Sequence, residues 1–175
     1  MEKYINRPTY LNFLLLHKEK KIIKVVSGIR RCGKSTLFEI YQQYLLSHGV
    51  KKEQIISINL EDITYQDKDY KELYFDIKGH LLTDKMTYIF IDEIQNCHNF
   101  EKMVDSLFIQ PNVDIYITGS NAYFMSGELA TLLSGRYVEI KMLPLSFKEY
   151  ISYVGNNDIQ KKYVNYITNS SFPYT

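Results

Sequence analysis

The stretch "SGIRRCGKSTL", residues 27–37, decides which fold the rest of this chain must adopt. From Gly28 to Ser35 it satisfies the spacing G-x-x-x-x-G-K-[ST] at every fixed position. With this spacing, backbone N–H groups between the two glycines point inward and form a nest for an anion. Because glycine makes up about 7% of residues, a chance match in a chain of this length is of order one in a hundred. The stretch therefore predicts a phosphate-binding loop, and the rival interpretation is a basic turn between a strand and a helix.

The loop residues predict how a nucleotide and a magnesium ion would be held. Lys34 can reach the β- and γ-phosphates, and the hydroxyl of Ser35 can bind Mg²⁺. The helix that follows turns its positive end toward the anion. The predicted nucleotide-binding residues are Gly28, Ile29, Arg30, Arg31, Cys32, Gly33, Lys34, Ser35 and Thr36.

The residues between the two glycines contribute mainly backbone, so unusual side chains there do not break the motif. Arg30 and Arg31 either add positive potential near the phosphates or face solvent or an acidic partner. Cys32 follows them near a helix N-terminus and a lysine, conditions that lower the pKa of a thiol. Redox control and an inert filler residue are the two interpretations of this cysteine.

A second motif, "YIFIDE" at residues 88–93, is a short, largely apolar run that ends in two carboxylates. A strand there delivers Asp92 and Glu93 to the carboxyl end of a parallel sheet, where the ligands of such sheets bind. Asp92 would hold Mg²⁺ opposite Ser35, and Glu93 would polarise an attacking water. The chain lacks the N-K-x-D segment with which GTPases commonly recognise guanine, so ATP is the expected nucleotide. The rival interpretation is an ordinary acidic turn at a strand end.

Two later segments supply further candidates for the same site. "IYITGSN", residues 115–121, ends an apolar strand with Thr118 and Asn121, either of which could lie near the γ-phosphate and the attacking water. A plain turn cap is the alternative. Arg136 follows a glycine in "LLSGRYVEI" and could stabilise charge on the transferred phosphate, in its own chain or in a neighbour. A structural salt bridge is the rival role for this arginine.

Apolar runs and helical spacings alternate along the chain. Strands are expected at residues 21–28, 54–60, 86–95, 113–121 and 136–143. Helices are expected at residues 10–21, 34–48, 99–110, 125–135, 145–155 and 158–168, and the segment 61–82 is expected to be polar at first and to become helical toward Leu82. This order implies right-handed crossovers and an α/β fold, a P-loop NTPase three-layer α/β/α sandwich around a mainly parallel five-stranded sheet. We expect residues 1–155 to form the nucleotide-binding domain and residues 156–175 to begin a C-terminal region.

Composition narrows the class of protein. The 175 residues carry a net charge of +1, and neither a recognised reader motif nor a clear basic stripe is present, so nucleic acid is not an expected partner. No signal peptide and no apolar run long enough to cross a membrane are seen, so the expected setting is cytoplasmic and reducing. The only two cysteines are far apart, and Cys97-His98 lacks the further ligands of a metal site.

Taken together, the chain resembles the ATPase domain of the AAA-like archaeal and bacterial ATPases within the wider AAA+ class. The resemblance rests on "VVSGIRRCGKSTL", "IFIDEIQ", "ITGSNAYFMSGELATLLSGRYVEI" and "LPLSFKEY". It implies that residues 28–36 bind nucleotide, that Asp92 and Glu93 serve magnesium and water, and that Arg136 is a finger or sensor. Similar proteins continue into a C-terminal domain resembling the restriction-endonuclease fold, whose role does not transfer to these residues.

The expected function is Mg²⁺-dependent ATP hydrolysis that drives a conformational change in an attached or partner domain. A nucleotide-gated interaction module with negligible hydrolysis alone is the alternative. Completing groups could come from a further C-terminal part or from another subunit. Besides ATP, a second copy of the chain or a partner protein is an expected partner. A small-molecule kinase is the weakest rival, because the adjacent Asp-Glu pair suits water better than an acceptor substrate.

Overall fold

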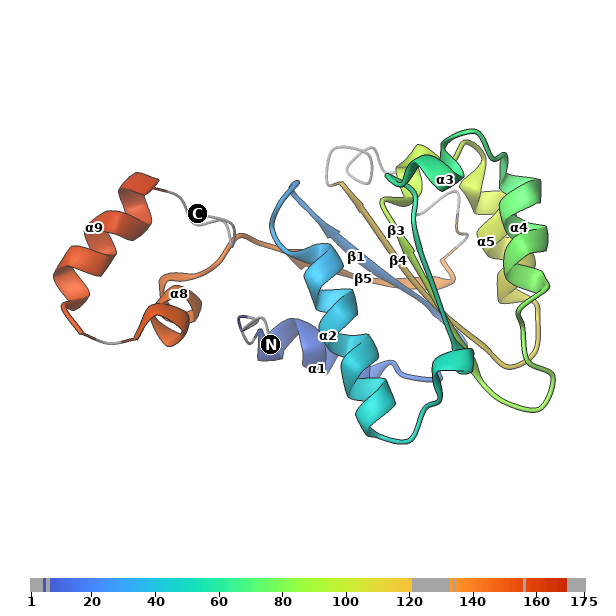
Figure 1. Ribbon diagram of the computed structural model, residues 1–175, viewed down its shortest axis with the longest axis horizontal. Helices are drawn as coiled ribbons and strands as arrows, with labels where there is room; N and C mark the ends of the chain where they lie inside the picture. Colours follow the sequence, from blue (N-terminus) through green and yellow to red (C-terminus); the bar gives the residue numbers. More distant parts are fainter. Residues whose placement is uncertain (1–4, 6, 121–132, 134, 156, 170–175) are drawn as a thin grey trace.

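Figure 1 shows the computed structural model, which describes residues 5, 7–120, 133, 135–155 and 157–169. Five parallel strands form one sheet in the order β2-β3-β4-β1-β5. The strands are β1 (Ile23–Gly28), β2 (Ile55–Asn59), β3 (Thr87–Asp92), β4 (Val113–Ser120) and β5 (Tyr137–Met142). The helices are α1 (Pro8–Leu16), α2 (Lys34–Ser47), α3 (Ile63–Gln66), α4 (Tyr70–Lys78), α5 (Phe100–Phe108), α8 (Phe147–Val154) and α9 (Ile159–Asn169). Two short 3₁₀ helices, η1 (Lys52–Gln54) and η2 (Ile94–Asn96), precede β2 and follow β3.

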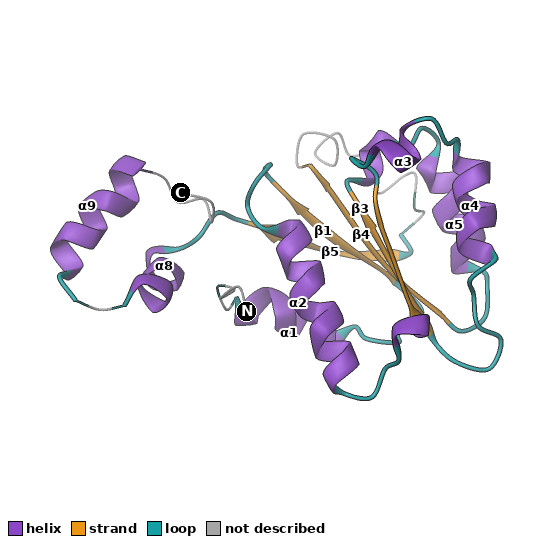
Figure 2. Cartoon of the chain, viewed as in Figure 1, coloured by secondary structure: helices purple, strands orange, loops and turns teal. Residues whose placement is uncertain are grey.

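The predicted α/β fold with a parallel five-stranded sheet is confirmed, and side chains of β3 show how its three layers form. Ile89 and Ile91 point to one face and pack with apolar side chains of α4 and α5. Tyr88 and Phe90 point to the other face and pack with those of α1 and α2. This alternation follows from the two-residue period of a strand and leaves β3 buried on both faces. Figure 2 shows the two helical layers on either side of the sheet.

Several predicted boundaries shift for local physical reasons. The first helix begins earlier than expected, with Pro8 in its first turn, where a missing N–H costs nothing. The helical segment expected at residues 61–82 is two helices, because Asp62 and Asp69 each cap a new start. The strand expected to run to residue 95 ends at Asp92. The helix expected at residues 125–135 lies largely outside the described residues.

The parallel register brings the functional motifs to one edge of the sheet. Gly28 at the end of β1 is paired with Ser120 of β4 and with Met142 of β5. On the far side of β4, Asp92 ends β3 opposite Asn59 of β2. Because all strands run the same way, every carboxyl end meets at this edge.

The two C-terminal helices extend away from the sheet beyond the end of β5 (Figure 1). Phe147 of α8 packs against the rings of Tyr163 and Tyr166 of α9, with ring centroids 5.1 and 5.4 Å away. The Tyr166 hydroxyl donates to the carbonyl of Leu145 at 2.6 Å. These contacts join α8 and α9 into one unit. Among the described helices, none has the length and apolar character needed to cross a membrane.

Candidate functional site

The predicted phosphate loop connects β1 to α2 as a tight turn. A Cβ added to Gly28 would lie 2.4 Å from the Met142 carbonyl oxygen and 2.8 Å from the Cys32 sulfur, so the neighbouring strand β5 forbids any larger residue. Gly33 has φ 97° and Arg31 has φ 67°, both in the left-handed region. At Gly33 the absence of a side chain removes the cost of this conformation. The loop therefore needs its glycines for packing and backbone geometry as well as for an approaching phosphate.

Lys34, the first residue of α2, connects the loop to the end of β3. Its side chain is buried, with 3% of its surface exposed. Its ammonium donates to the carbonyl of Gly28 at 3.3 Å and lies 3.3 Å from Oε1 of Glu93. A buried cation in the first turn of a helix, directly after a glycine-bounded loop, is an arrangement suited to a phosphate.

Asp92 lies buried between the phosphate loop and β4. The Thr118 hydroxyl donates a hydrogen bond to its carboxylate, and the side chain of Ser35 makes a second hydrogen bond to it. Burial raises the pKa of Asp92, and these hydrogen bonds oppose that rise. Ser35 and Asp92 thus present a hydroxyl and a carboxylate side by side, which are oxygen ligands of the kind that Mg²⁺ takes while keeping several waters.

Glu93 has an unusual backbone for a residue with a side chain. Its φ of 53° and ψ of 53° are left-handed and end β3. Its N–H donates to the Thr118 hydroxyl oxygen at 3.0 Å. Its Oε2 accepts from the Gln95 amide at 2.6 Å, while Oε1 faces Lys34. The strained turn directs the carboxylate toward the phosphate loop, and both of its oxygens are held there.

The structure brings Lys34, Ser35, Asp92, Glu93 and Thr118 together at one end of the sheet. Thr118 was expected near the γ-phosphate, but its hydroxyl bridges the carboxylate of Asp92 and the backbone of Glu93. It therefore orients the acidic pair. The other candidate from this segment, Asn121, lies outside the described residues.

Gln95 is a site residue that the sequence reasoning missed. Besides donating to Glu93, its side-chain oxygen accepts from the N–H of Ser120 at 3.4 Å, at the end of β4. In the sequence, the signal for this role is a glutamine, with its long amide side chain, two residues after Glu93. Only the left-handed turn at Glu93 and the helix η2 return that side chain to the site.

Arg136 lies just before β5, at the end of the sheet where the strands begin, whereas the phosphate loop lies at the end where the strands finish. Its carbonyl accepts from the N–H of Ile23, the first residue of β1, at 2.9 Å. Gly28 is five residues further along that strand, roughly 16 Å away at the usual rise of a strand. The Arg136 guanidinium is 3.2 Å from the Asp105 carboxylate and lies near the ring of Phe108. In its own chain, Arg136 therefore does not reach the phosphate loop.

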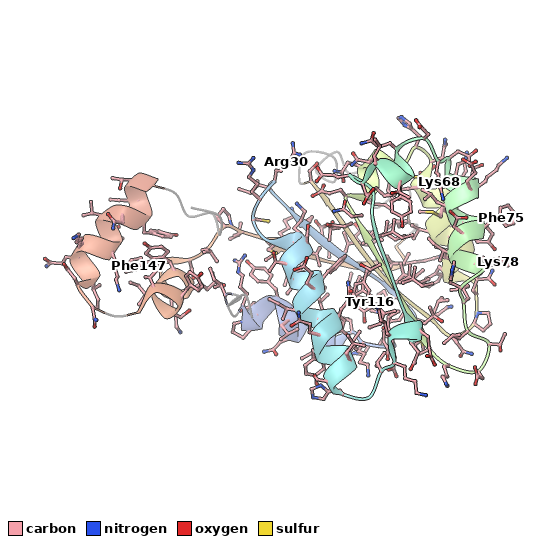
Figure 3. The ribbon with its side chains drawn as sticks, in the orientation of Figure 1. Arg30, Lys68, Phe75, Lys78, Tyr116 and Phe147 are labelled. Atoms are coloured by element: carbon pink, nitrogen blue, oxygen red, sulfur yellow. The ribbon has the colours of Figure 1, made fainter. Side chains whose placement is uncertain are left out.

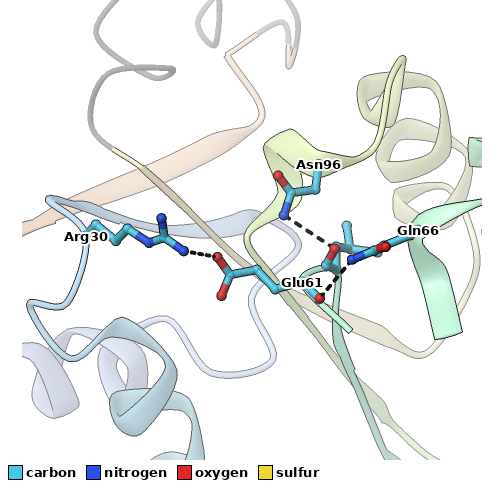
Figure 4. A pocket seen from close by; sticks show the side chains of 5 residues that line it. Arg30, Glu61, Gln66 and Asn96 are labelled. Carbon is cyan, nitrogen blue, oxygen red and sulfur yellow. Dashed lines mark hydrogen bonds and ion pairs between the residues drawn. The ribbon is translucent and has the colours of Figure 1, made fainter. Parts of the chain in front are cut away.

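Arg30 and Cys32, which fill the loop, have opposite environments. Arg30 is exposed and pairs with Glu61 at 2.9 Å, beyond the end of β2 (Figure 4). Together they border a polar cavity of about 440 Å³, lined by Arg30, Leu60, Glu61, Gln66 and Asn96. Cys32 is fully buried, and burial raises the pKa of its thiol, whereas Lys34 and Arg7 lower it less. The expectation that its surroundings lower this pKa is therefore wrong.

The side-chain view in Figure 3 separates these surface groups from the interior. Arg30 points outward from the loop, whereas Tyr116 lies inside, between the sheet and α2. Tyr116 donates to Asp114 at 2.7 Å, and Asp114 also pairs with Lys24. This buried polar cluster lies on the strands that carry the site.

A comparison with family models matches residues 20–151 to an AAA domain. The matched range runs from just before β1 into α8 and includes the phosphate loop and the acidic pair. The chain belongs to the AAA domain family. This membership supports a nucleotide-binding, ATPase-like domain.

Curated relatives of this AAA domain are longer proteins without a described function. An uncharacterised protein of Haemophilus influenzae is 45% identical over 168 residues, which cover 92% of this chain and 40% of the relative. The uncharacterised protein MJ1544 of Methanocaldococcus jannaschii is 36% identical over 142 residues, covering 81% of this chain and 30% of the relative. The chain thus spans less than half the length of these relatives.

Solved structures with similar folds are AAA+ proteins at low sequence identity. Hsp104 of Saccharomyces cerevisiae in an ADP complex gives a TM-score of 0.67 with 16% identity, covering 88% of this chain and 24% of that one. A protein related to the DNA polymerase III gamma subunit, from Thermotoga maritima, gives 0.60 with 10% identity, covering 87% and 52%. At such identities the likeness concerns the fold alone.

Proposed function

We propose that this AAA domain hydrolyses ATP with Mg²⁺ and uses the cycle to move an attached or partner domain. The observation that carries this proposal is the buried cluster in which Lys34, Asp92 and Glu93 meet beside the phosphate loop. A site that only held a nucleotide would need the loop and its lysine. It would not need the second carboxylate, that of Glu93, which a left-handed backbone positions and whose two oxygens contact Lys34 and Gln95.

Each residue has a role that follows from its position. Backbone N–H groups of residues 28–36 bind the phosphates, and Lys34 neutralises charge on the β- and γ-phosphates. Ser35 and Asp92 would hold Mg²⁺, which neutralises developing charge on the phosphate oxygens. Thr118 keeps the Asp92 carboxylate oriented toward that position.

Glu93 is the proposed base that polarises the attacking water. Its Oε1 faces Lys34, so a γ-phosphate that attracts the lysine ammonium would free this oxygen for water. Gln95 retains its hydrogen bond to Oε2 and keeps the carboxylate in place during that exchange. The same contact that links lysine and glutamate would thus make water activation depend on a bound triphosphate.

The test is phosphate release from Mg-ATP over a range of protein concentrations, with Glu93→Gln as the blank. We expect turnover by the unmodified chain and a rate about 10²- to 10⁴-fold lower in the variant, which loses its base. Both proteins should bind nucleotide. Turnover that is equal in the two proteins would exclude Glu93 as the base.

A nucleotide-gated interaction module is the second candidate, and the position of Arg136 favours it. Because this arginine is remote from its own phosphate loop, one chain alone lacks an arginine finger from this residue. A specific rate that rises with protein concentration would indicate a site completed by a neighbouring chain. Tight nucleotide binding without turnover at any concentration would establish the interaction module instead.

A further inference from the structure

Arg7, just before the first helix, is a buried cation that contacts three separate parts of the fold. Its guanidinium is 6% exposed. It donates to the carbonyl of Cys32 at 3.0 Å, to that of Leu143 at 2.8 Å, and to that of Pro144 at 3.2 Å. It also pairs with the carboxylate of Glu149 at 2.9 Å. One side chain therefore joins the phosphate loop, the end of β5 and the helix α8.

The contact with Cys32 acts on the phosphate nest itself. The carbonyl of Cys32 and the N–H of Gly33 belong to one planar trans peptide unit and point in opposite directions. A guanidinium that fixes this carbonyl therefore fixes the direction of the Gly33 N–H. That N–H belongs to the N-cap residue of α2, in the turn where the phosphate is proposed to bind.

The opposite side of Arg7 is fixed to the chain that leaves the sheet. Its guanidinium lies 4.4 Å from the ring centroid of Tyr10, and the Tyr10 hydroxyl accepts from the N–H of Leu143 at 3.1 Å. These contacts hold the segment between β5 and α8 against α1. Arginine suits this place, because its five donors are spread over a planar fork that reaches acceptors on separate segments, whereas the three donors of a lysine share one nitrogen.

Glu149 carries the link into α8. Its carboxylate accepts from Arg7 and also from the N–H and hydroxyl of Ser146, the N-cap of this helix, at 2.7 and 2.8 Å. Burial acts to raise the pKa of Glu149, but the hydrogen bonds from Arg7 and Ser146 outweigh it and hold this pKa below its usual value. Because α8 and α9 pack as one unit, a displacement of Glu149 is passed to α9.

We propose that Arg7 couples nucleotide occupancy of the phosphate loop to the placement of the α8–α9 unit. The proposal rests on nucleotide binding at that loop, as proposed above. If a phosphate shifts the Cys32–Gly33 peptide, the buried guanidinium must follow or lose an acceptor, and an unsatisfied buried donor is costly. If the guanidinium follows the loop, it moves Glu149 and, with it, α8. By thermodynamic reciprocity, the position of α8 then influences nucleotide affinity.

The test is hydrogen exchange of backbone amides in residues 147–169, with and without Mg-ATP, on the whole 175-residue chain. The unmodified chain should show several-fold different exchange in α8 and α9 when nucleotide is bound. Arg7→Lys keeps the charge but loses the fork, so it should weaken nucleotide binding about tenfold and abolish the exchange difference. Binding is measured with a fluorescent ATP analogue, and folding is checked by thermal unfolding.

Two further variants separate coupling from a merely structural role. Glu149→Gln leaves the contact between Arg7 and Cys32 intact, so it should bind nucleotide nearly normally yet lose the response in α8–α9. Ser146→Ala is the matched control: it removes the cap from α8 but keeps the pair of Arg7 with Glu149. In this variant the backbone amides of α8 should exchange faster both with and without Mg-ATP, and the difference between the two conditions should remain.

The outcomes distinguish this inference from the function on which it rests. Nucleotide that binds the unmodified chain without changing exchange in residues 147–169 overturns the coupling alone. An unchanged response in both Arg7→Lys and Glu149→Gln overturns it as well. Failure of the unmodified chain to bind any nucleotide overturns the proposed function, and the coupling with it.

Discussion

The ammonium of Lys34 lies 3.3 Å from the carboxylate of Glu93, so the phosphate loop and the end of β3 are joined by a largely buried ion pair. These two residues are 59 positions apart in the sequence, and the parallel register of the sheet brings them together. In the proposed reaction one partner binds phosphate and the other activates water. Their contact therefore connects substrate binding to the chemical step.

Replacing Lys34 by methionine should weaken nucleotide binding about 10- to 100-fold, because charge-assisted hydrogen bonds to the phosphates are lost. Titration with a fluorescent ATP analogue measures the dissociation constant. Lys85→Met, which removes an exposed lysine beside Glu53, is the control and should bind normally. Equal affinity in both variants would contradict the role of Lys34.

Thr118→Val should lower the free energy of unfolding by about 1–3 kcal/mol. The change keeps the shape of the side chain but removes the acceptor of the Glu93 N–H and one of the two side-chain hydrogen bonds to the buried Asp92 carboxylate. Urea unfolding measures the loss, and Thr118→Ser, which restores the hydroxyl, should recover most of it. If serine does no better than valine, the hydroxyl is not the stabilising group.

Gln95→Leu should lower kcat several-fold with little change in KM, because Gln95 holds the proposed base and is not among the residues proposed to bind the nucleotide. Steady-state phosphate release separates the two constants. Gln42→Leu removes an exposed amide that bonds Ser57 and serves as the control. A rise in KM with unchanged kcat would place Gln95 in binding instead.

Arg136→Ala should reduce turnover while leaving nucleotide affinity intact, if this arginine acts on a neighbouring chain. Mixing Arg136→Ala chains with Glu93→Gln chains then restores part of the activity, since some sites combine an intact Glu93 with an intact Arg136 from the neighbour. Phosphate release from the mixture, compared with each variant alone, decides the matter. A mixture no more active than its components would leave Arg136 with its pair to Asp105 as a structural contact.

The buried pair of Lys24 and Asp114 should be the most sensitive polar contact away from the site. Both side chains are fully buried, and Asp114 also accepts from the N–H of Glu19 at 2.8 Å and from Tyr116. Lys24→Met leaves an uncompensated buried carboxylate and should cost about 3–5 kcal/mol in urea unfolding. The double variant with Asp114→Asn should be more stable than Lys24→Met alone, and a still larger loss would refute this account.

Residue spacing along the chain is enough to predict the phosphate loop, the acidic pair and the alternation of strands and helices. These features are local, since each depends on spacing within one segment or on the two-residue period of a buried strand. The same patterns were enough to expect a parallel sheet with its motifs at one edge. They also predict that Lys34, Asp92 and Glu93 lie at one site.

The features that the sequence does not predict depend on contacts between distant parts of the chain. The register of β1 with β5 places Arg136 beside the start of β1, away from the phosphate loop, although the sequence around it predicted a role in the site. A left-handed turn at Glu93 brings Gln95 back to the carboxylate. Arg7 meets the Cys32 carbonyl across 25 positions and Glu149 across 142, and its sequence neighbourhood carries no signal of either contact. Such contacts arise only when packing of the whole chain fixes which distant backbone groups a buried side chain must satisfy.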